Sequence, residues 1–427
     1  MKIFIPKEVK FLIDKLYENG YEAFIVGGCV RDSILNLIPH DYDITTNANP
    51  NEILGIFREY KTIDTGINHG TVSIVLNNNI YDITTYRIEG EYENNRRPKN
   101  IVFTHNIYED LSRRDFTINA IAYNENIGII DKFNGLDDLN KKIIKTVGNP
   151  DERFEEDGLR MIRAIRFSSK LGFNIEENTL NSIYKKAHIV KNISIERIND
   201  EFTKILLSNN PQNIIILYKS SIFEYLGIYS KLNGYHYKEL EKNIVVLRSC
   251  DKNLLDRLIM LEYLISNEIL KDIDCDKKYK YYCENIKKIN IINNLRYSNK
   301  VINYCNDIME YMFKDIEKID RVTIKRYLNH IGYNKLNKVL KLKLIYNIFF
   351  DNKTKIEFIK KYIDILNEIE NNKECYTIKN LDIDGKVLKD LGYNGREIGE
   401  KLDFLLGEVI KSPLLNKKEN LIELLKL

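Results

Sequence analysis

The chain has 427 residues, of which 44% are hydrophobic, and this length predicts about two to four domains with buried cores. Its 65 Lys and Arg residues nearly balance 62 Asp and Glu residues, so a net charge of +3 does not by itself indicate a nucleic-acid partner. The six cysteines form no Cys-x-x-Cys pair, which argues against a zinc site or a disulfide framework and favours a reducing compartment. The sequence shows no targeting signal and no apolar run long enough to span a bilayer, so we expect a soluble, cytoplasmic protein.

The first part of the chain mixes helical and strand patterns. Helical spacing of apolar residues is found in Val9–Tyr17 and Val30–Leu37. Alternating or continuous apolar runs predict strands at Glu22–Val26, Tyr42–Thr45, Thr71–Leu76 and Ile80–Tyr86. Three asparagines, Asn77–Asn79, predict a hairpin turn between the last two strands. The pattern indicates an α+β domain with a small mixed, partly antiparallel sheet.

The pattern changes at Gly148–Pro150, where a turn signal interrupts it. Strand signals nearly vanish after this point, and apolar residues recur at helical spacing to the end of the chain. We therefore predict an elongated all-α part after the α+β head.

Two aspartates near the start of the chain indicate a metal site. Asp41 and Asp43 are two residues apart, so in a strand their side chains lie on one face. Adjacent carboxylates repel each other unless a cation lies between them, and a hard ion such as Mg²⁺ suits two carboxylates plus substrate phosphates. Taken alone, a solvated strand edge explains such a pair better. We expect His40 to flank the strand rather than to bind metal.

A glycine turn precedes the aspartate pair. Gly27 and Gly28 follow an apolar strand and precede a helix, where backbone N–H groups can approach an anion closely. Arg31 is close enough in sequence to reach a triphosphate, Asp32 can hold or cap the turn, and Cys29 is expected to be a small buried residue. A plain tight turn is the alternative. Together, the turn and the aspartate pair indicate nucleotidyl transfer.

The sequence resembles a known family from these residues onward. VGGCVRD followed by HDYDI resembles the signature of class II nucleotidyltransferases of the polymerase β superfamily, and more closely that of the tRNA nucleotidyltransferases that add CCA. Further segments that resemble this family, in its order, are Thr65–Val75, Glu109–Asn124, Glu155–Phe167 and Ser194–Leu206. The similarity covers about the first half of the chain. The second half matches mainly in its helical character.

The resemblance implies an activity and a domain organisation. The domains would be a nucleotidyltransferase head at 1–148, a base-recognising neck at 149–208, a helical body at 209–320 and a tRNA-binding tail at 321–427. The activity would be template-independent addition of C, C and A from CTP and ATP to the 3′ end of tRNA, with Mg²⁺ on Asp41 and Asp43. Gly28, Arg31 and Arg114 would then hold the triphosphate. No obligate protein partner and no membrane association are implied.

The segment EDLSRRDFTINA supplies a second group of charged residues. Arg113, Arg114 and Asp115 precede an apolar run that we predict to be a helix. Arg114 is expected to contact the triphosphate, and Asp115 to fix Arg114 or to cap the helix. The family places a third catalytic carboxylate in or near this segment, and Asp110 is the candidate here. A capped helix with surface arginines is the alternative.

The segment EEDGLRMIRAIRF predicts how the base is chosen. Asp157, Arg160, Arg163 and Arg166 recur every three residues on an expected helix, so neighbouring members share a face. A carboxylate at Asp157 could accept from a base amino group while the guanidinium of Arg160 donates to the adjacent ring nitrogen. Cytosine and adenine present an amino donor beside a ring-nitrogen acceptor, whereas guanine and uracil present the reverse order. Arg163 is placed for phosphate or for holding Asp157, and Arg166 is more peripheral. A salt-bridge ladder on a solvated face is the alternative.

A polar segment between the expected strands bears on how far addition proceeds. Tyr86–Thr104 contains Arg87 and Arg96–Pro98 and is predicted to be a mobile loop. In the family, a flexible loop here is needed to add the final A, and enzymes that add only CC lack part of it. Its presence favours full CCA addition.

A glycine-rich segment near the end of the chain, Ile383–Leu402, is the second candidate RNA contact. The glycines expected to interrupt the helix are Gly385, Gly392, Gly395 and Gly399. Exposed backbone amides beside Lys386, Lys389 and Arg396 could bind RNA phosphates without reading bases. Two short packed helices with glycine caps are the alternative.

Three other activities remain open. A bacterial poly(A) polymerase shares the glycine turn and the aspartate pair, but Thr65–Val75 replaces the basic segment of polyadenylating members, and we expect no basic tail after Leu427. A CC-only or A-only enzyme is a further alternative. A non-catalytic RNA-binding protein would be expected to lose the carboxylates, and both Asp41 and Asp43 are present.

Overall fold

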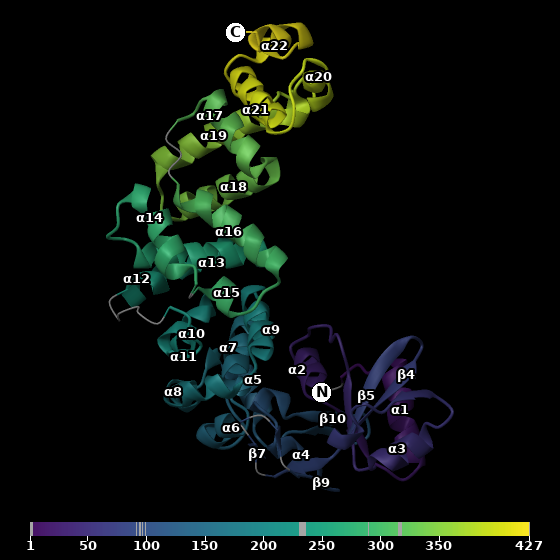
Figure 1. The fold of residues 1–427 in the computed structure, drawn as a ribbon. Helices are drawn as coiled ribbons and strands as arrows, with labels where there is room; N and C mark the ends of the chain where they lie inside the picture. The colour runs from purple at the N-terminus through teal and green to yellow at the C-terminus, as the bar shows by residue number, and fades with distance from the viewer. Residues whose placement is uncertain are drawn as a thin grey trace. The chain divides into compact units, whose positions relative to one another are not determined.

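The computed structural model describes residues 3–90, 92–93, 95, 97–98, 100–229, 236–288, 290–314 and 318–426. The chain folds into two compact units, Met1–Lys231 and Leu232–Leu427 (Figure 1). The first unit contains the sheet, and the described secondary structure of the second unit is helical, which confirms the predicted fold class. The finer division into head, neck, body and tail stays a prediction.

A mixed sheet forms the centre of the first unit. Its described strands lie in the order β11-β10-β1-β2-β5-β4-β3. The strands are β1 (Ala23–Val26), β2 (Asp43–Thr46), β3 (Lys61–Ile63), β4 (Thr71–Leu76), β5 (Asn79–Thr85), β10 (Ala122–Asn124) and β11 (Gly128–Ile130). β2 and β5 are parallel, and the other neighbouring pairs are antiparallel. Every residue of β1 is buried, which fits its continuous apolar sequence.

The asparagine turn confirms the predicted hairpin. Leu76 pairs with Asn79, so Asn77 and Asn78 form a two-residue connection between β4 and β5. Their φ angles are 51° and 63°, which asparagine tolerates better than most residues. Positive φ at both central positions matches the twist of antiparallel strands. The local sequence therefore sets the register of this part of the sheet.

Helices cover the sheet and continue beyond it. In the sheet region they are α1 (Lys7–Glu18), α2 (Gly28–Ile34), α3 (Pro50–Ile56), α4 (Ile107–Ser112) and α5 (Gly135–Lys141). After Gly148 they are α6 (Pro150–Glu156), α7 (Leu159–Leu171), α8 (Glu177–Lys186), α9 (Ile195–Leu206), α10 (Ile215–Lys219) and α11 (Ile222–Tyr225). The pair β12 (Ile143–Ile144) and β13 (Asn174–Ile175) is parallel. α7 packs along α9, so these parts of the motif segments Glu155–Phe167 and Ser194–Leu206 lie side by side.

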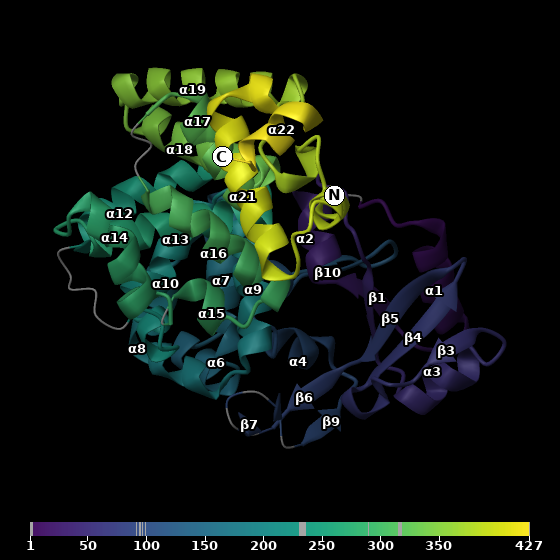
Figure 2. The same ribbon diagram turned by 45° about the horizontal axis from the view of Figure 1, so that its top comes forward.

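The segment predicted as a loop contains a β-ribbon. β6 (Arg87–Glu89) pairs with β9 (Ile101–Phe103), and the two lie next to each other in Figure 2. Further along, β7 (Tyr92–Glu93) pairs with β8 (Arg97–Pro98). The prediction of a loop was therefore wrong for these residues. Short antiparallel strands rich in charged residues lack the apolar alternation from which strands are predicted. Arg96 lies outside the described residues.

Two predicted helices are also corrected by the structure. α6 ends at Glu156, and Asp157 has an extended backbone before α7 begins at Leu159. Gly158 lies so close to Ile189 that an added Cβ would be 2.7 Å from Ile189 Cγ2, so the chain is tightly packed at this break. The apolar run after Asp115 forms a 3₁₀ turn at Thr117–Asn119 followed by β10 instead of a helix.

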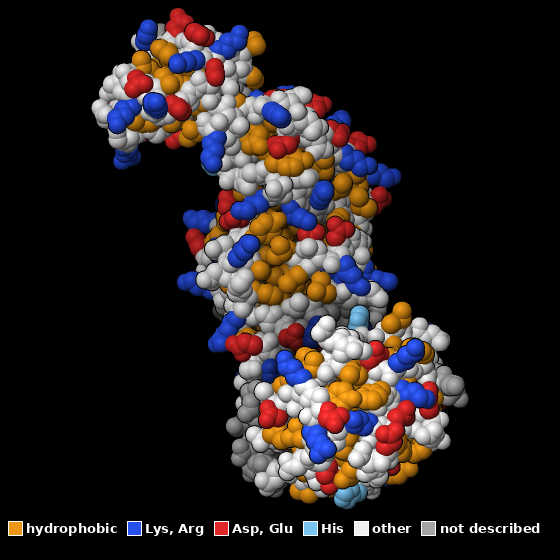
Figure 3. All heavy atoms as spheres, turned by 90° about the vertical axis from the view of Figure 1, so that its right-hand side faces the viewer, with side chains coloured by type: hydrophobic (Ala, Val, Ile, Leu, Met, Phe, Trp, Pro, Cys, Tyr) orange, Lys and Arg blue, Asp and Glu red, His pale blue; other side chains and the backbone are white. Residues whose placement is uncertain are grey.

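The second unit is built from packed helices. They are α12 (His236–Asn243), α13 (Leu254–Ile269), α14 (Cys275–Tyr281), α15 (Ile291–Asn294), α16 (Asn299–Phe313), α17 (Arg321–Ile331), α18 (Tyr333–Phe349), α19 (Lys353–Asn371), α20 (Gly385–Asp390), α21 (Arg396–Lys411) and α22 (Lys418–Leu424). None of the described helices is both long and apolar enough to cross a membrane. On the face drawn in Figure 3, basic and acidic side chains are interspersed, as the near-balanced composition predicts.

The glycine-rich segment breaks the helix at only some of its glycines. Gly392 and Gly395 have φ angles of 97° and 56° and separate α20 from α21. Gly385 begins α20, where Asp384 accepts hydrogen bonds from the backbone. Gly399 lies inside α21, so the prediction that it interrupts the helix was wrong.

Candidate active site

A cavity of about 610 Å³ lies within the first unit. All the predicted site residues except Asp110 line it, namely Gly28, Arg31, Asp41, Asp43, Arg114, Asp157, Arg160, Arg163 and Arg166. They come from α2, from the start of β2, from the segment after α4 and from the segment between α6 and α9. The fold thus joins in one cavity motifs that lie more than a hundred positions apart.

The glycine turn requires glycine at its first position. Gly27 has φ 79° and ψ −125°, a backbone conformation that residues with a Cβ rarely adopt. A Cβ at this position would lie 3.2 Å from Nη1 of Arg114. The turn therefore places the backbone directly beside a guanidinium that lines the cavity.

Replacing Gly27 by alanine should impair both folding and catalysis. The strained φ should lower the free energy of unfolding by about 1–3 kcal/mol, and the contact with Arg114 should lower kcat/KM by at least about tenfold. Gly128→Ala is a matched control, because Gly128 has φ 87° but an added Cβ would meet no atom within 4 Å. Urea unfolding and an assay of the nucleotide addition that the sequence resemblance implies measure the two effects. Equal losses of kcat/KM in both variants would contradict the proposed closeness to Arg114.

Arg31 is held in a fixed orientation at the cavity wall. Its Nε donates to Asp32 Oδ1 at 2.7 Å and its Nη1 donates to Asn119 Oδ1 at 2.6 Å. The guanidinium carbon lies 5.0 Å from the ring centroid of Phe167 on α7. Sequence reasoning missed Asn119 and Phe167, because contacts between distant segments leave no periodic signal.

The aspartate pair forms one edge of the cavity. Burial raises the pKa of Asp43, Arg114 opposes this change, and the charges of Asp41 and Asp82 raise the pKa further. Mutually repelling carboxylates of this kind favour a bound cation. No cluster of three or more His, Cys, Asp or Glu residues suited to a metal is found in the described part of the chain. Two carboxylates alone fit a hard divalent ion that takes its other ligands from substrate and water.

The turn's cysteine behaves as predicted for a buried residue. Cys29 is 2% exposed, and its Sγ lies 3.4 Å from the carbonyl oxygen of Val26. Burial raises the pKa of this thiol to about 12. A thiol that stays protonated at neutral pH is a poor nucleophile, so the cysteine has no chemical part in the site.

Asp110 lies behind the cavity and not in it. Its carboxylate is completely buried and accepts from Arg113 Nε at 2.9 Å, from Arg113 Nη2 at 2.7 Å and from Arg114 Nη2 at 3.1 Å. Burial alone would raise the pKa of Asp110, but Arg114 and Arg113 together lower it. This placement favours a role in positioning the two arginines over the predicted catalytic role.

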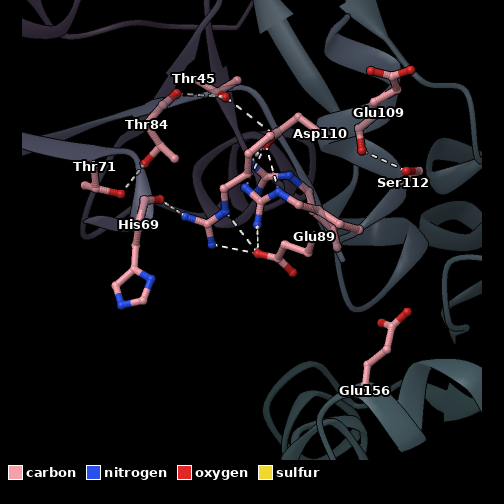
Figure 4. A network of polar contacts seen from close by, with 12 residues as sticks. Thr45, His69, Thr71, Thr84, Glu89, Glu109, Asp110, Ser112 and Glu156 are labelled. Carbon is pink, nitrogen blue, oxygen red and sulfur yellow. Dashed lines mark hydrogen bonds and ion pairs between the residues drawn. The ribbon is translucent and has the colours of Figure 1, made fainter. Parts of the chain in front are cut away.

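The network around Asp110 extends to the β-ribbon. Figure 4 shows Thr45 next to Asp110, with its Oγ1 3.4 Å from Asp110 Oδ2. Glu89 of β6 accepts from Arg113 at 3.0 Å and from Arg87 at 2.7 Å. One connected set of charges therefore joins the strand that carries Asp43, the ribbon and the arginines of the cavity.

Asp82 is the additional carboxylate beside the aspartate pair. β2 and β5 run in parallel with Ile44 opposite Ile83, so the residues before them, Asp43 and Asp82, are neighbours. The side chain of Asp82 accepts from Ser73 Oγ at 2.5 Å. Sequence reasoning missed it, although its position one residue before an apolar strand core matches that of Asp43.

Asp115 binds a different arginine from the one predicted. Its Oδ2 accepts from Arg163 Nε at 2.9 Å and Nη2 at 2.7 Å, whereas Arg114 binds Asp110. Its Oδ1 accepts from the backbone N–H of Phe116 at 2.8 Å. Burial would raise the pKa of Asp115, but Arg163 and Asn119 outweigh it and lower the pKa to about 2. The prediction that Asp115 fixes Arg114 was wrong, because the order of residues in the sequence does not tell in which direction neighbouring side chains point.

Asp157 and Arg160 both line the cavity but are held separately. Asp157 Oδ2 accepts from Arg197 Nη2 at 2.9 Å, and its Oδ1 accepts from the N–H of Leu159 at 3.1 Å. Arg160 donates to Glu156 Oε2 at 2.5 Å and to the carbonyl oxygen of Arg113 at 2.9 Å. The predicted single helix through both residues is wrong, yet the two functional groups still reach the same cavity.

α9 supplies two supporting residues that the sequence analysis did not identify. Arg197 binds Asp157, and Glu201, one turn later, accepts from Arg166 Nε. Glu201 is 3% exposed, and its Oε1 lies 3.8 Å from Arg163 Nη1. A charged residue on the apolar face of a helix was the available signal, because such residues are seldom buried without a partner.

Comparison with known proteins agrees with this geometry. Residues 23–145 match the family described as poly A polymerase head domain, and residues 172–227 match a probable RNA and SrmB-binding site of polymerase A. A CCA-adding enzyme of Ligilactobacillus salivarius is 35% identical over 428 residues, covering 98% of this chain and 96% of that protein. The chain belongs to the CCA-adding enzymes.

Other members of the family support the assignment. A CCA-adding enzyme of Limosilactobacillus reuteri is 52% identical over 200 residues, which is 47% of this chain and 49% of that protein. The Bacillus stearothermophilus CCA-adding enzyme, solved in complex with CTP, is 27% identical with a TM-score of 0.72 and covers 99% of this chain and 98% of that one. The Thermotoga maritima CCA-adding enzyme, solved with tRNA, shares the fold at 21% identity and a TM-score of 0.61, covering 100% and 99% of the two chains. The predicted family and its nucleotidyltransferase activity are confirmed.

Proposed function

We propose that this CCA-adding enzyme extends the 3′ end of tRNA with C, C and A, using CTP and ATP and releasing pyrophosphate. The observation that carries the proposal is the single cavity in which two carboxylates, a glycine turn and a set of arginines meet Asp157 and Arg160. Related enzymes solved with CTP, with ATP and with tRNA support these substrates. The buried free thiols of Cys29 and Cys305 suit the reducing cytoplasm, where we place the enzyme.

Asp41 and Asp43 would hold Mg²⁺ ions, with substrate oxygens and water as the remaining ligands. Bound there, the metal would lower the pKa of the RNA 3′ hydroxyl and neutralise charge on the phosphates. Asp82 adds a third negative charge to the aspartate pair, and this increases the repulsion that a bound cation would relieve.

Arg31 and Arg114 are suited to hold the triphosphate. The guanidinium of Arg114 lines the cavity, so its N–H groups can donate to a phosphate oxygen bound there. Because Asp110 and Asn119 fix the two guanidinium groups in advance, binding costs little side-chain entropy. As the 3′ oxygen bonds to the α-phosphorus, the bond to pyrophosphate breaks, and these arginines balance the charge on the departing group.

Asp157 and Arg160 are suited to select the base. Each carboxylate oxygen has two lone pairs, so the bonds from Arg197 and Leu159 leave Asp157 able to accept from a base amino group. The guanidinium of Arg160 can donate to the adjacent ring nitrogen. Cytosine and adenine satisfy both groups, whereas guanine and uracil place a donor or an acceptor opposite its own kind. Arg163 and Arg166 line the same cavity and are held by Asp115 and Glu201, respectively.

Asp157→Ala should relax base choice while leaving the aspartate pair intact. The ratio of kcat/KM for CTP to that for UTP should fall by at least about tenfold, because each mismatched buried hydrogen bond costs about 1–3 kcal/mol. Single-nucleotide incorporation into tRNA measures the ratio. Asp151→Ala is a control, since Asp151 binds Ser182 and Lys185 instead of lining the cavity. Unchanged discrimination against UTP and GTP would refute the base-reading role.

The extent of addition is tested with a tRNA that lacks its 3′ CCA. The substrate is incubated with Mg²⁺ and with each labelled nucleotide, separately and together. Ordered addition of C, C and then A is the expected result, and the retained ribbon with Arg87 bound to Glu89 supports the final A. Arrest after CC would assign a CC-only enzyme, and a long A tail from ATP alone would assign a poly(A) polymerase.

A further inference from the structure

A second cavity lies inside the helical unit that spans Leu232–Leu427. Its volume is about 460 Å³, within the range of about 300–1,000 Å³ typical of small-molecule sites. α13, α16, α18 and α19 pack against one another (Figure 1). All four line the cavity, and α14 contributes Lys278 to it. All its lining residues belong to this unit, so the cavity is independent of the candidate active site.

Aromatic rings form one part of the wall. The ring of Tyr263 lies 5.4 Å from that of Phe313 and 5.3 Å from that of Tyr346, measured between centroids. Phe358, half-buried on α19, also lines the cavity. Flat rings that hold one another in place offer a surface on which any of the nucleobases can stack.

The charged groups that line this cavity are all cationic. They are Lys278, Lys343 and Lys355, and no Asp or Glu is among the described lining residues. Lys278 Nζ donates to Asn267 Oδ1 at 3.1 Å, and because an ammonium has three N–H donors, it can also donate to an anion. The nearby carboxylate of Glu268 pairs with Lys271 at 3.4 Å and does not line the cavity. Like charges that share a cavity favour a bound anion.

Two carboxamides complete the wall. Asn267 and Asn347 both line the cavity, and Asn347 Nδ2 donates to the carbonyl oxygen of Lys343 at 2.7 Å. Its Oδ1 atom can accept from an amino group, and the amide of Asn267 can donate. These groups match the mixed donors and acceptors on the edge of a base.

We propose that this cavity binds a nucleotide unit, with the base against the aromatic wall and the phosphate on the lysines. The ligand is either a free mononucleotide or an unpaired nucleotide of an RNA chain, since both present the same base and phosphate. Lys278 holds the phosphate together with Lys343, whose Nζ also donates to the carbonyl oxygen of Lys314, and the rings of Tyr263 and Phe358 contact the base. The proposal does not depend on the active-site assignments.

A tryptophan reporter tests the proposal, because the chain contains no tryptophan. Phe358→Trp places a fluorophore at the cavity wall, and Phe349→Trp is the matched control on α18, where the side chain is 38% exposed and does not line the cavity. Titration with AMP should quench only the Phe358→Trp signal, with a Kd between about 10 µM and 1 mM. Adenosine and inorganic phosphate, which each lack half of the ligand, should bind at least about tenfold more weakly.

The lysines provide a second, independent measurement. Lys278→Met and Lys343→Met should each weaken AMP binding to the reporter by at least about fivefold, through loss of a charged hydrogen bond. Calorimetric titration of the otherwise unchanged chain with and without Lys278→Met tests the same loss without a tryptophan. Tighter binding of a short single-stranded RNA than of AMP would assign the RNA source, and the reverse order would assign a free nucleotide. Equal quenching of both reporters, or AMP binding that is insensitive to both lysine changes, would overturn the proposal.

Discussion

Replacing Asp43 by alanine should abolish nucleotide addition without weakening the fold. With one of the two proposed metal ligands removed, kcat should fall by at least about 10³-fold, which corresponds to about 4 kcal/mol of transition-state stabilisation. Burial raises the pKa of Asp43, Arg114 opposes this change, and the charges of Asp41 and Asp82 raise the pKa further, so the ionised side chain is on balance disfavoured in the metal-free protein. Its removal should therefore leave the free energy of unfolding unchanged or slightly higher. Rapid-quench incorporation assays and urea unfolding measure the two quantities.

Asp64→Ala is the matched control for the Asp43 variant. Asp64 is exposed, follows a strand of the same sheet and does not line the cavity. Its replacement should change kcat by less than about twofold, as for surface substitutions away from a site. A chelator should abolish the activity of the unmodified enzyme, and added Mg²⁺ should restore it. Substantial activity in Asp43→Ala would contradict the metal assignment, and a clear loss of stability would contradict the argument from repulsion.

Replacing Asp110 by asparagine should weaken both the fold and the handling of triphosphate. Neutralising this completely buried carboxylate removes a negative charge that two guanidinium groups bind, although Arg113 keeps its ion pair with Glu89. Such a change should lower the free energy of unfolding by about 3 kcal/mol. Arg114 would lose the partner that orients it, so KM for CTP should rise more than kcat falls. Urea unfolding and steady-state kinetics with CTP test both parts.

The pH dependence of this variant is a further check. Because the arginines lower the pKa of Asp110 in the folded protein, the carboxylate stabilises the fold at neutral pH and loses this effect as pH falls through the folded pKa. The stability difference between the two proteins should therefore shrink as pH falls from about 5 to 3. Asp137→Asn, which removes an exposed ion pair with Lys141, should change stability little. A fall in kcat alone, with KM and stability unchanged, would instead support a catalytic role for Asp110.

The parts of this fold that local chemistry decides could be predicted from the sequence. Asn77 and Asn78 tolerate positive φ, so the hairpin and its register follow from two residues. The glycine turn and the aspartate pair are similarly local. The turn follows directly from the end of β1, and the pair lies at the start of β2. Asp41, Asp43 and Gly28, which these features singled out, line one cavity.

The features that tertiary contacts decide could not be predicted in this way. The spacing of Asp157 from Arg160 predicted one helix through both residues, but α6 ends at Glu156 and Asp157 has an extended backbone where Gly158 packs against Ile189. The partner of Asp115 was also misassigned, because side-chain direction depends on how the backbone turns after α4. Arg197 and Glu201 lie about forty positions after the residues that they hold.

The charged ribbon shows the limit of composition as a guide. Tyr86–Thr104 is polar and lacks a clear alternation, which is typical of a loop, yet β6 and β9 pair with each other. Glu89 pairs with Arg87 and Arg113 there, so its charge is satisfied by neighbours that the sequence pattern does not reveal. Buried ion networks of this kind remove the hydrophobic signal on which strand prediction depends.

The most direct test of this account is a crystal structure of the enzyme with CTP and Mg²⁺. The account predicts metal density at Asp41 and Asp43, the triphosphate against Gly28, Arg31 and Arg114, and the pairing edge of cytosine facing Asp157 and Arg160. Metal bound elsewhere, or a cytosine whose pairing edge faces away from Asp157 and Arg160, would contradict it.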